Sequence, residues 1–405
     1  MLALLGGPPV LRPGELGGWP VLTAEDEASV LAALRDAMPW RWPMRAATEL
    51  EDAWSELTGM PYVLAVNSGT AALHMALVAM GVGPGDEVLV PADTFGATAQ
   101  AVLHAGARPV FVDSDPVTYT IDPAQAETAI TPATRAVLPV DLHGLPADYA
   151  ALGRLGLAVV EDGAQAHGAT YRGRQVGALG DASGLSLNGS KTLSSAGEAG
   201  LFATADREGH LRARALMTFG ESQSRATGEM PEVTSVGWNY RIHVLGAAFA
   251  RSQLRRLAEM SDSRAANGAA LTGLLTGIPG LLLPVVPEDR THVYFLYPLL
   301  VRPEEFGLGP EYVPAFRDAL REAATAEGLP IGRWQTKPLP HHRLFKDRQE
   351  FPVAADICAR RLSIGHSSCP IGPPHTRNTM RRIAAVFEKI LVTEGTAFRR
   401  MVTGR

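Results

Sequence analysis

Lys191 is the only lysine in the first 336 residues of a chain that otherwise prefers arginine. The 405 residues include 37 lysines and arginines, of which four are lysines, at positions 191, 337, 346 and 389. Arginine stays protonated and cannot become a nucleophilic amine, whereas a lysine with a lowered pKa can form a Schiff base with a carbonyl group. An exposed lysine without a special role is the ordinary interpretation of Lys191, so other residues must decide.

Two carboxylates end an apolar run 29 positions earlier (191 − 162 = 29). Residues 157–162 read LAVVED, and a carboxylate at the end of a buried strand needs a partner because an unpaired buried charge is costly. A protonated ring nitrogen would suit Glu161 or Asp162. Gln165 and His167 follow on the next turn, where isolated polar residues are usually ordinary loop residues.

Two further stretches could bind other parts of a ligand. In VNSGTAALHMALVAMG, Ser68 and Thr70 stand at the start of a helix expected over 71–80, where hydroxyls and free N–H groups suit a phosphate. A simple capped helix is the ordinary interpretation of this motif. Phe95 follows the run EVLVP among small residues, where an aromatic ring packs in the core or covers a planar ligand.

These features together have one economical explanation, which is pyridoxal phosphate. This cofactor needs a phosphate cradle, an aromatic platform, a carboxylate and a lysine. Lys191 would hold the aldehyde as a Schiff base, and Asp162 would keep the pyridinium protonated so that the ring can accept electrons.

Such residues need a scaffold, and the chain predicts an α/β fold. From about residue 60, helical stretches separate apolar runs at 87–91, 108–113, 135–141, 157–162, 184–187 and 200–204. Apolar strands separated by helices indicate a mostly parallel sheet sandwiched by helices. Ligands of such folds bind at the carboxyl ends of the strands. We assign residues 1–250 to an N-terminal segment and this large domain.

Beyond Arg251 the pattern predicts a smaller C-terminal α+β domain over 251–405. A long polar-faced helix is expected over 251–275, a strand over 292–301, and further helices over 313–329 and 376–392. The first thirty or so residues are expected to pack against this domain.

The composition is that of a soluble globular protein. Its 405 residues exceed the length at which one hydrophobic core usually stops growing, so a large domain and a smaller one are expected. A formal net charge of −5 and the lack of a basic run argue against a nucleic-acid partner. The apolar N-terminus has no basic segment and is interrupted by Pro8 and Pro9, so neither a signal peptide nor a membrane anchor is expected. Cys358 and Cys369 are too few for a disulfide framework or a four-cysteine metal site. We expect a reduced, cytoplasmic protein without a metal.

Several motifs in order make the chain resemble the DegT/DnrJ/EryC1/StrS family of fold-type I pyridoxal-phosphate enzymes. They are NSGTAALHMAL, DTFGATAQAVLHAGARPVFVD, YTIDPAQAETAITPATRAVLPVDLHGLPAD, VVEDGAQAHGATYRGRQVG and SKTLSSAGEAG. The likeness covers most of residues 20–390. It implies an aminotransferase that moves an amino group from L-glutamine or L-glutamate to a keto sugar or cyclitol ketone, in the biosynthesis of amino-sugar or aminoglycoside antibiotics.

The resemblance also implies roles for single residues around the cofactor ring. Lys191 would be the Schiff-base lysine, and Asp162 the partner of the pyridine nitrogen. Phe95 would stack on one face of the ring, with Gln165 near the other face and the ring hydroxyl.

The phosphate-binding residues implied by the resemblance are Gly69, Thr70 and Ser186. GWNYRIHVLGAAFARSQL resembles the segment from which an asparagine reaches the neighbouring subunit's phosphate. Asn239 is therefore the candidate, and a homodimer with a shared active site is the implied assembly. Arg241 would be structural or line the site.

Some features leave the substrate open. The sequence has GEAG at 197–200, where the family usually has Gly-Glu-Gly-Gly, Leu185 and Leu187 in place of two phenylalanines, and an unusual MPWRWPMRA at 38–46. The leucines keep an apolar strand, and only the departures around Ala199 and at Trp40 to Trp42 leave room for a lyase, dehydratase or oxidase acting on a related sugar or amino acid. The sugar 3-dehydratases of the family carry histidine at the lysine position, which disfavours that branch. A cofactor-binding regulator is disfavoured because no DNA-reading motif precedes the fold.

The C-terminal stretches resemble the cyclitol branch somewhat more than the nucleotide-sugar branch. They contain three histidines that could line a hydroxyl-rich site, although ordinary surface or core histidines are the commoner case; these are His341, His342 and His366. Four arginines are candidates for binding the donor's carboxylate, namely Arg41, Arg45, Arg241 and Arg333.

Overall fold

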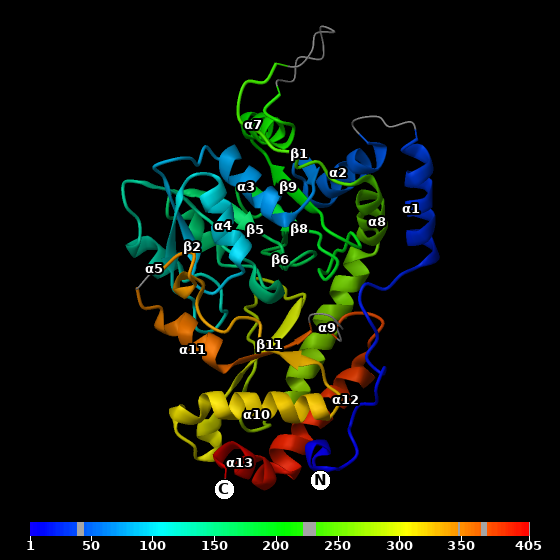
Figure 1. The fold of residues 1–405 in the computed structure, drawn as a ribbon, viewed down its shortest axis with the longest axis vertical. Helices are drawn as coiled ribbons and strands as arrows, with labels where there is room; N and C mark the ends of the chain where they lie inside the picture. Colours follow the sequence, from blue (N-terminus) through cyan, green and yellow to red (C-terminus); the bar gives the residue numbers. More distant parts are fainter. Residues whose placement is uncertain (39–43, 222–231, 347–348, 366–370, 405) are drawn as a thin grey trace.

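The computed structural model describes residues 1–38, 44–221, 232–346, 349–365 and 371–404 (Figure 1). Within these residues a seven-stranded sheet, here the large sheet, lies above a four-stranded sheet, here the small sheet, in the view of Figure 1. Each sheet carries its own helices. Both ends of the chain lie beside the helices of the small sheet.

The large sheet is mostly parallel, which confirms the predicted fold class. Its order is β1-β9-β8-β5-β4-β2-β3. The parallel strands are β2 (Glu87–Pro91), β3 (Arg108–Val112), β4 (Thr134–Val137), β5 (Ala158–Asp162) and β8 (Ala182–Ser186). Two antiparallel pairings add β9 (Gly200–Thr204) and β1 (Tyr62–Val66) at one edge. The strand expected over 135–141 is interrupted after Val137, because Pro139 has no N–H for the ladder, and pairing with β5 resumes in a bridge between Val140 and Asp162.

Alternate residues of the strands face two separate cores, which explains why the strands are apolar on both faces. In β1, Val63 and Ala65 pack with α2 (Arg45–Thr58) and α8 (Val244–Leu254). Leu64 and Val66 pack on the other face with α3 (Gly69–Ala79), α4 (Gly96–His104) and α7 (Arg207–Met217). Shorter elements complete this part, namely α5 (Pro123–Thr128), α6 (Tyr149–Gly153), β6 (Thr170–Tyr171) and β7 (Arg174–Gln175).

The small sheet is antiparallel and has its own core. Its order is β10-β11-β13-β12, with bounds Leu281–Leu282, Leu296–Val301, Arg361–Gly365 and Ile331–Gly332. The helices of this part are α10 (Val313–Ala326), α11 (Pro352–Arg360), α12 (Arg377–Glu388) and α13 (Gly395–Thr403). Of the helices that the structure describes, none has the length and apolar character needed to cross a bilayer.

The single long helix predicted over 251–275 is wrong, because the chain forms two helices there. Helix α8 ends at Leu254 and packs on α2 and α1 (Ala24–Asp36), whereas α9 (Leu257–Leu275) packs on α12. Arg256 breaks the helical backbone with φ −106° and ψ 4°, and its guanidinium pairs with the buried Asp26 at 2.8 Å. The two residues are 230 positions apart, so the helical periodicity of the local sequence could not reveal the pair. The domain boundary at residue 250 stays a prediction.

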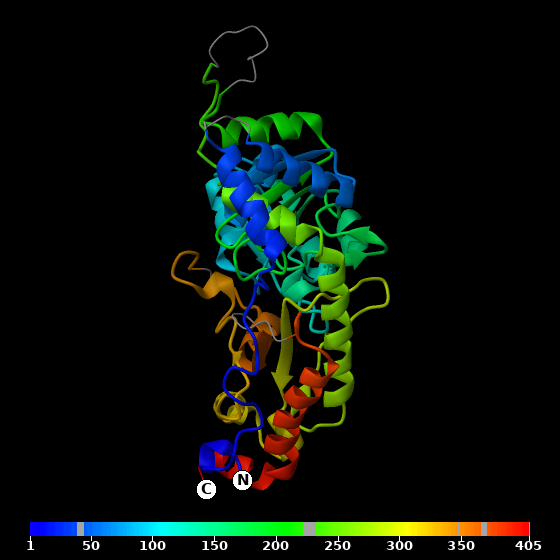
Figure 2. The same cartoon turned by 90° about the vertical axis from the view of Figure 1, so that its right-hand side faces the viewer.

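The first residues of the chain pack partly on the small sheet and partly beside the large sheet (Figure 2). Leu2 and Leu11 are fully buried in the core of the small sheet, while α1 packs on α8 beside the large sheet. The closing helix predicted over 376–392 ends at Glu388. The chain continues there as a short π-helix (Lys389–Thr393), in which Lys389 Nζ donates to the Glu327 carboxylate at 2.8 Å.

A buried ion pair joins the two parts of the molecule. Asp93, just beyond β2, and Arg361, at the start of β13, are 1% and 0% exposed. Both terminal guanidinium nitrogens of Arg361 donate to the carboxylate, one of them at 2.9 Å. The Trp334 ring lies 5.1 Å from the same guanidinium. The pair therefore fixes the small sheet against a strand end of the large sheet.

Replacing Asp93 with asparagine is expected to destabilise the protein strongly. Asp93→Asn would leave the buried Arg361 charge without its counter-charge, which costs about 3–5 kcal/mol of unfolding free energy. Urea denaturation followed by circular dichroism measures this loss. The matched control is Asp356→Asn, because Asp356 pairs with Arg360 but is 58% exposed, and a loss within about 1 kcal/mol is expected there. Equal losses in the two variants would contradict the structural role of the pair.

Candidate active site

The predicted site residues lie at one edge of the large sheet. Asp162 ends β5, Ser186 ends β8, and Phe95 follows β2 at the start of α4. Because β2, β5 and β8 run in the same direction, their carboxyl ends meet at this edge. The strand ends thus bring together residues that are far apart in the sequence.

Asp162 is the strand-end carboxylate that faces the lysine. It is 4% exposed and accepts hydrogen bonds from the Thr98 hydroxyl at 2.8 Å and the Ala164 N–H at 3.2 Å. Burial raises the pKa of Asp162, while these two hydrogen bonds and the Lys191 charge act in the opposite direction. A cationic ring nitrogen would stabilise the ionised carboxylate further.

Glu161 has a different, structural partner. Its carboxylate accepts from the backbone N–H groups of Gly177 at 2.5 Å and Leu179 at 2.8 Å. These contacts hold the loop before β8, although burial still raises the pKa of Glu161 to about 7. Of the two carboxylates that end the strand, only Asp162 interacts with Lys191.

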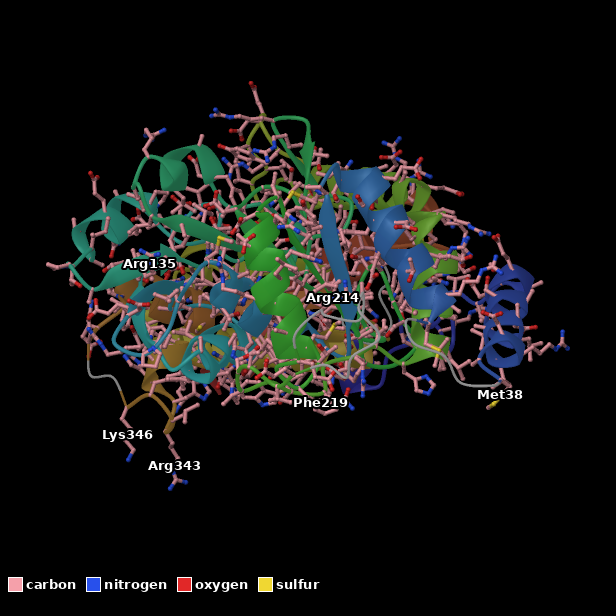
Figure 3. The ribbon with its side chains drawn as sticks, turned by 90° about the horizontal axis from the view of Figure 1, so that it is seen from above. Met38, Arg135, Arg214, Phe219, Arg343 and Lys346 are labelled. Carbon is pink, nitrogen blue, oxygen red and sulfur yellow. The ribbon has the colours of Figure 1, made fainter. Side chains whose placement is uncertain are left out.

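The surroundings of Lys191 differ from those of the other lysines. Lys337 and Lys346 are exposed, and Figure 3 shows Lys346 projecting away from the body of the protein. Lys389 pairs with Glu327. Lys191 is partly buried, with its ammonium 4.5 Å from the centre of the Phe295 ring. Burial lowers the pKa of Lys191 to about 8, against the opposing effect of the Asp162 and Glu198 carboxylates.

The start of α3 forms a cradle against β8. A Cβ on Gly69 would lie 2.6 Å from the Ser186 Cβ, so only glycine permits this close approach. Ser68 caps the helix by accepting from the Ala71 N–H at 3.1 Å. The N–H groups of Gly69 and Thr70 have no hydrogen-bond acceptor within the described residues. Free N–H groups at a helix N-terminus are suited to a phosphate.

Phe95 and Gln165 are held in contrasting ways. Phe95 is 58% exposed, so its ring is accessible to a planar partner. Gln165 is 3% exposed, and its side-chain oxygen accepts from the His143 backbone N–H at 2.9 Å. The amide is thus already oriented by the protein.

Asn239 lies close to the phosphate cradle of its own chain but on the surface. Its backbone carbonyl accepts from the Asn67 side chain at 3.1 Å, and Asn67 precedes Ser68. The Asn239 side-chain oxygen accepts from Arg241 Nε at 3.0 Å. Its predicted reach to a neighbouring subunit stays a prediction.

The other candidate residues gain no role in this arrangement. Arg45 pairs with Glu49 at 2.9 Å, and Arg333 follows β12 in the small sheet. His341 Nε2 lies 2.9 Å from the Gln349 carbonyl. Arg41 and His366 fall outside the described residues.

Sequence reasoning missed several residues that position the site. Thr98 stands one turn after Phe95, a spacing that could have revealed it. Phe295 lies within an expected strand, where nothing marks a contact with Lys191. His167 was expected to be an ordinary loop residue, but it is fully buried, with its Nδ1 atom 3.1 Å from the hydroxyl of Thr192. His167 is buried by the packing of the loops beyond the strands, which the local sequence does not show.

The arrangement fits pyridoxal phosphate on three observations. The start of α3 approaches Ser186 closely at Gly69 and presents the N–H groups of Gly69 and Thr70, which have no acceptor among the described residues. The buried Asp162 carboxylate is placed for a cation, and Lys191 is an amine whose pKa is lowered. Together they provide a phosphate site, a partner for the pyridine nitrogen and an amine that can link to an aldehyde.

Comparisons with known proteins agree with this chemistry. Residues 22–387 match the model of the DegT/DnrJ/EryC1/StrS aminotransferase family. The chain is 36% identical over 374 residues to a dTDP-3-amino-3,4,6-trideoxy-alpha-D-glucose transaminase of Streptomyces venezuelae, covering 91% of this chain and 92% of that protein. It is 35% identical over 348 residues to a UDP-N-acetyl-3-dehydro-alpha-D-glucosamine 3-aminotransferase of Acidithiobacillus ferrooxidans, covering 84% and 88%.

Solved structures show the same fold. The structure of DesV from S. venezuelae in complex with a ketimine intermediate superposes with a TM-score of 0.79 at 32% identity, covering 90% of this chain and 93% of that one. The structure of 3-amino-5-hydroxybenzoic acid synthase gives a TM-score of 0.82 at 27% identity, covering 93% and 98%.

Lys191 is expected to react as an amine at a lower pH than an ordinary lysine. In the cofactor-free protein, its acetylation rate should reach half its maximum near pH 8, the pKa that burial sets. Peptide mass spectrometry measures the rate, with N-acetyl-lysine amide in the same buffer as the control. Asp162→Asn should move the midpoint lower still, because the ammonium loses a stabilising negative charge. A midpoint near the ordinary value of about 10.4 would contradict this.

Proposed function

Because the chain belongs to the DegT/DnrJ/EryC1/StrS aminotransferase family, we propose that it transfers the amino group of L-glutamine or L-glutamate to a keto sugar or a cyclitol ketone. The enzyme is a pyridoxal-phosphate-dependent aminotransferase. Its acceptor, donor and biosynthetic setting are the proposed parts.

The observation that carries the proposal is the placement of Lys191 beside Asp162. Bound pyridoxal phosphate supplies an aldehyde for the amine and an electron-accepting ring for the bonds around the transferred nitrogen. Asp162 would hold the proton on the ring nitrogen, because the ionised carboxylate favours a cation beside it. Thr98 keeps that carboxylate turned toward the site.

Lys191 is also suited to move protons during the transfer. A pKa of about 8 leaves both protonation states populated near neutral pH, and general acid–base catalysis works best under that condition. The Lys191 ammonium lies 4.5 Å from the centre of the Phe295 ring, which occupies the space on that side of the amine. The amine can then take a proton from the carbon on one side of the transferred nitrogen and deliver it to the carbon on the other side.

The remaining residues would hold the cofactor in place. Gly69 and Thr70 would donate their free N–H groups to the phosphate, with the Ser186 hydroxyl beside them. Phe95 would cover one face of the ring. Gln165 would lie near the opposite face, held by the His143 N–H.

The two nucleotide-sugar relatives and the 3-amino-5-hydroxybenzoic acid synthase structure support a hydroxylated cyclic ketone as the acceptor. We further propose a role in the biosynthesis of an amino-sugar or aminocyclitol antibiotic. A cytoplasmic location without a nucleic-acid partner is supported by the two cysteines and the net charge of −5.

Adding L-glutamine or L-glutamate to the purified holoenzyme is expected to bleach its visible absorbance as the amino group moves to the cofactor. In Lys191→Ala this bleaching should slow by at least about 100- to 10,000-fold, because the proton-transferring amine is missing. Stopped-flow absorbance measures the rates. Lys346→Ala, at an exposed position, is the matched control and should behave like the wild type.

Two outcomes would overturn separate parts of this proposal. A coloured enzyme that neither donor bleaches would exclude these donors. A Lys191→Ala variant that keeps the wild-type colour and rate would exclude Lys191 as the reacting amine.

We propose that the active site is shared between two subunits, with Asn239 binding the partner's phosphate. Mixing inactive Lys191→Ala and Asn239→Ala chains by unfolding and refolding would then restore about a quarter of the wild-type activity. The reason is that half of the random dimers are hybrids and each hybrid has one intact site. Activity that stays at the level of the separate variants would show that Asn239 acts within its own chain.

A further inference from the structure

The backbone of Lys191 is held by a residue near the N-terminus, 172 positions earlier in the chain. The indole Nε1–H of Trp19 donates to the Lys191 carbonyl at 2.8 Å. Within the described residues, this carbonyl accepts no other hydrogen bond. The Lys191 N–H donates to the Asn188 carbonyl at 2.8 Å, so Trp19 completes the fixation of the two peptide units around the lysine.

The Trp19 ring packs against a buried cation, Arg264, which binds the segment that lies on the other side of the lysine. The Arg264 guanidinium lies 4.7 Å from the indole centre, and one of its nitrogens donates to the Tyr294 carbonyl at 3.4 Å. The next residue is Phe295, whose ring lies against the Lys191 ammonium. One cluster therefore contacts both the backbone and the amine of this lysine.

Trp19 belongs to a segment anchored at both ends, which we call the N-terminal strap (residues 1–23). At its beginning, Ala3 and Val10 donate their N–H groups to the Glu327 carboxylate at 2.8 and 3.0 Å. At its end, Thr23 caps α1. Figure 2 shows the strap running from the helices of the small sheet up to α1. Trp19 is thus held between two fixed points.

We propose that Trp19 is a positioning residue that aims Lys191 and keeps its amine in the buried site. This proposal rests on the proposed role of Lys191 as the amine that links to the cofactor. The lysine side chain must move during the reaction while its backbone stays in place. Without the indole N–H, the peptide unit after Lys191 is free to rotate, and the direction of the side chain changes with it.

The charged and titratable groups around the amine determine whether the pKa of Lys191 should rise or fall when Trp19 is replaced. Asp162 and Glu198 raise the pKa of Lys191, but burial lowers it by more. Burial, together with the nearby Lys191 charge, lowers the pKa of His167 to about 3. If Lys191 is less tightly held, its ammonium reaches water more easily, so its pKa should rise toward the ordinary lysine value.

The test compares Trp19→Phe, which keeps an aromatic ring but removes the N–H donor, with the wild type. In the cofactor-free protein, the pH midpoint of Lys191 acetylation should rise. In the holoenzyme, cofactor release into a trapping reagent should become about 3- to 10-fold faster, the effect of losing one neutral hydrogen bond. The control is Leu22→Ala in the same strap, because Leu22 is 58% exposed, and neither quantity should change there.

Trp19 is only partly buried, so the variant is expected to fold, and urea denaturation of the cofactor-free protein checks this directly. A lowered urea midpoint with unchanged acetylation and release would reduce Trp19 to a structural residue and overturn the inference. If wild-type Lys191 forms no link with the cofactor, the proposed function itself fails. The two failures are therefore distinguishable.

Discussion

The structure depends on placing an amine and a carboxylate together in a buried site. Lys191 and Asp162 both lose hydration there, which disfavours both charges, and each partly stabilises the other. The balance leaves Lys191 with a pKa of about 8, low enough for a reactive amine. Parallel strands are suited to this task because their carboxyl ends gather polar side chains at one edge of an apolar sheet.

Buried charges elsewhere in the protein are stabilised by structural partners. Glu161 accepts backbone N–H groups from the loop before β8, and Asp93 pairs with Arg361 across the two parts of the molecule. These groups are satisfied by the protein itself. The free N–H groups at the start of α3 and the exposed Phe95 ring are instead available to a ligand, and this difference separates the site from its scaffold.

The site is completed by segments that lie outside the large sheet. Phe295 precedes β11 of the small sheet and contacts the Lys191 ammonium. Trp19, from the N-terminal strap, binds the carbonyl of the same lysine. Because the Asp93–Arg361 pair holds the small sheet in place, the position of the reactive amine depends on contacts across the whole chain.

The sequence by itself predicted the α/β fold class and the mostly parallel sheet, which the structure confirms, and it singled out Lys191, Asp162, Phe95 and Gly69, whose roles stay proposals. These follow from local signals, because apolar runs, turn residues and motif order are properties of short stretches. Only the tertiary structure decided that Glu161 is bound by backbone N–H groups of the loop before β8, that His167 is buried, and that the helix predicted over 251–275 breaks at Arg256. Each of these depends on contacts between residues distant in the chain, where desolvation and pairing of charges override local pattern.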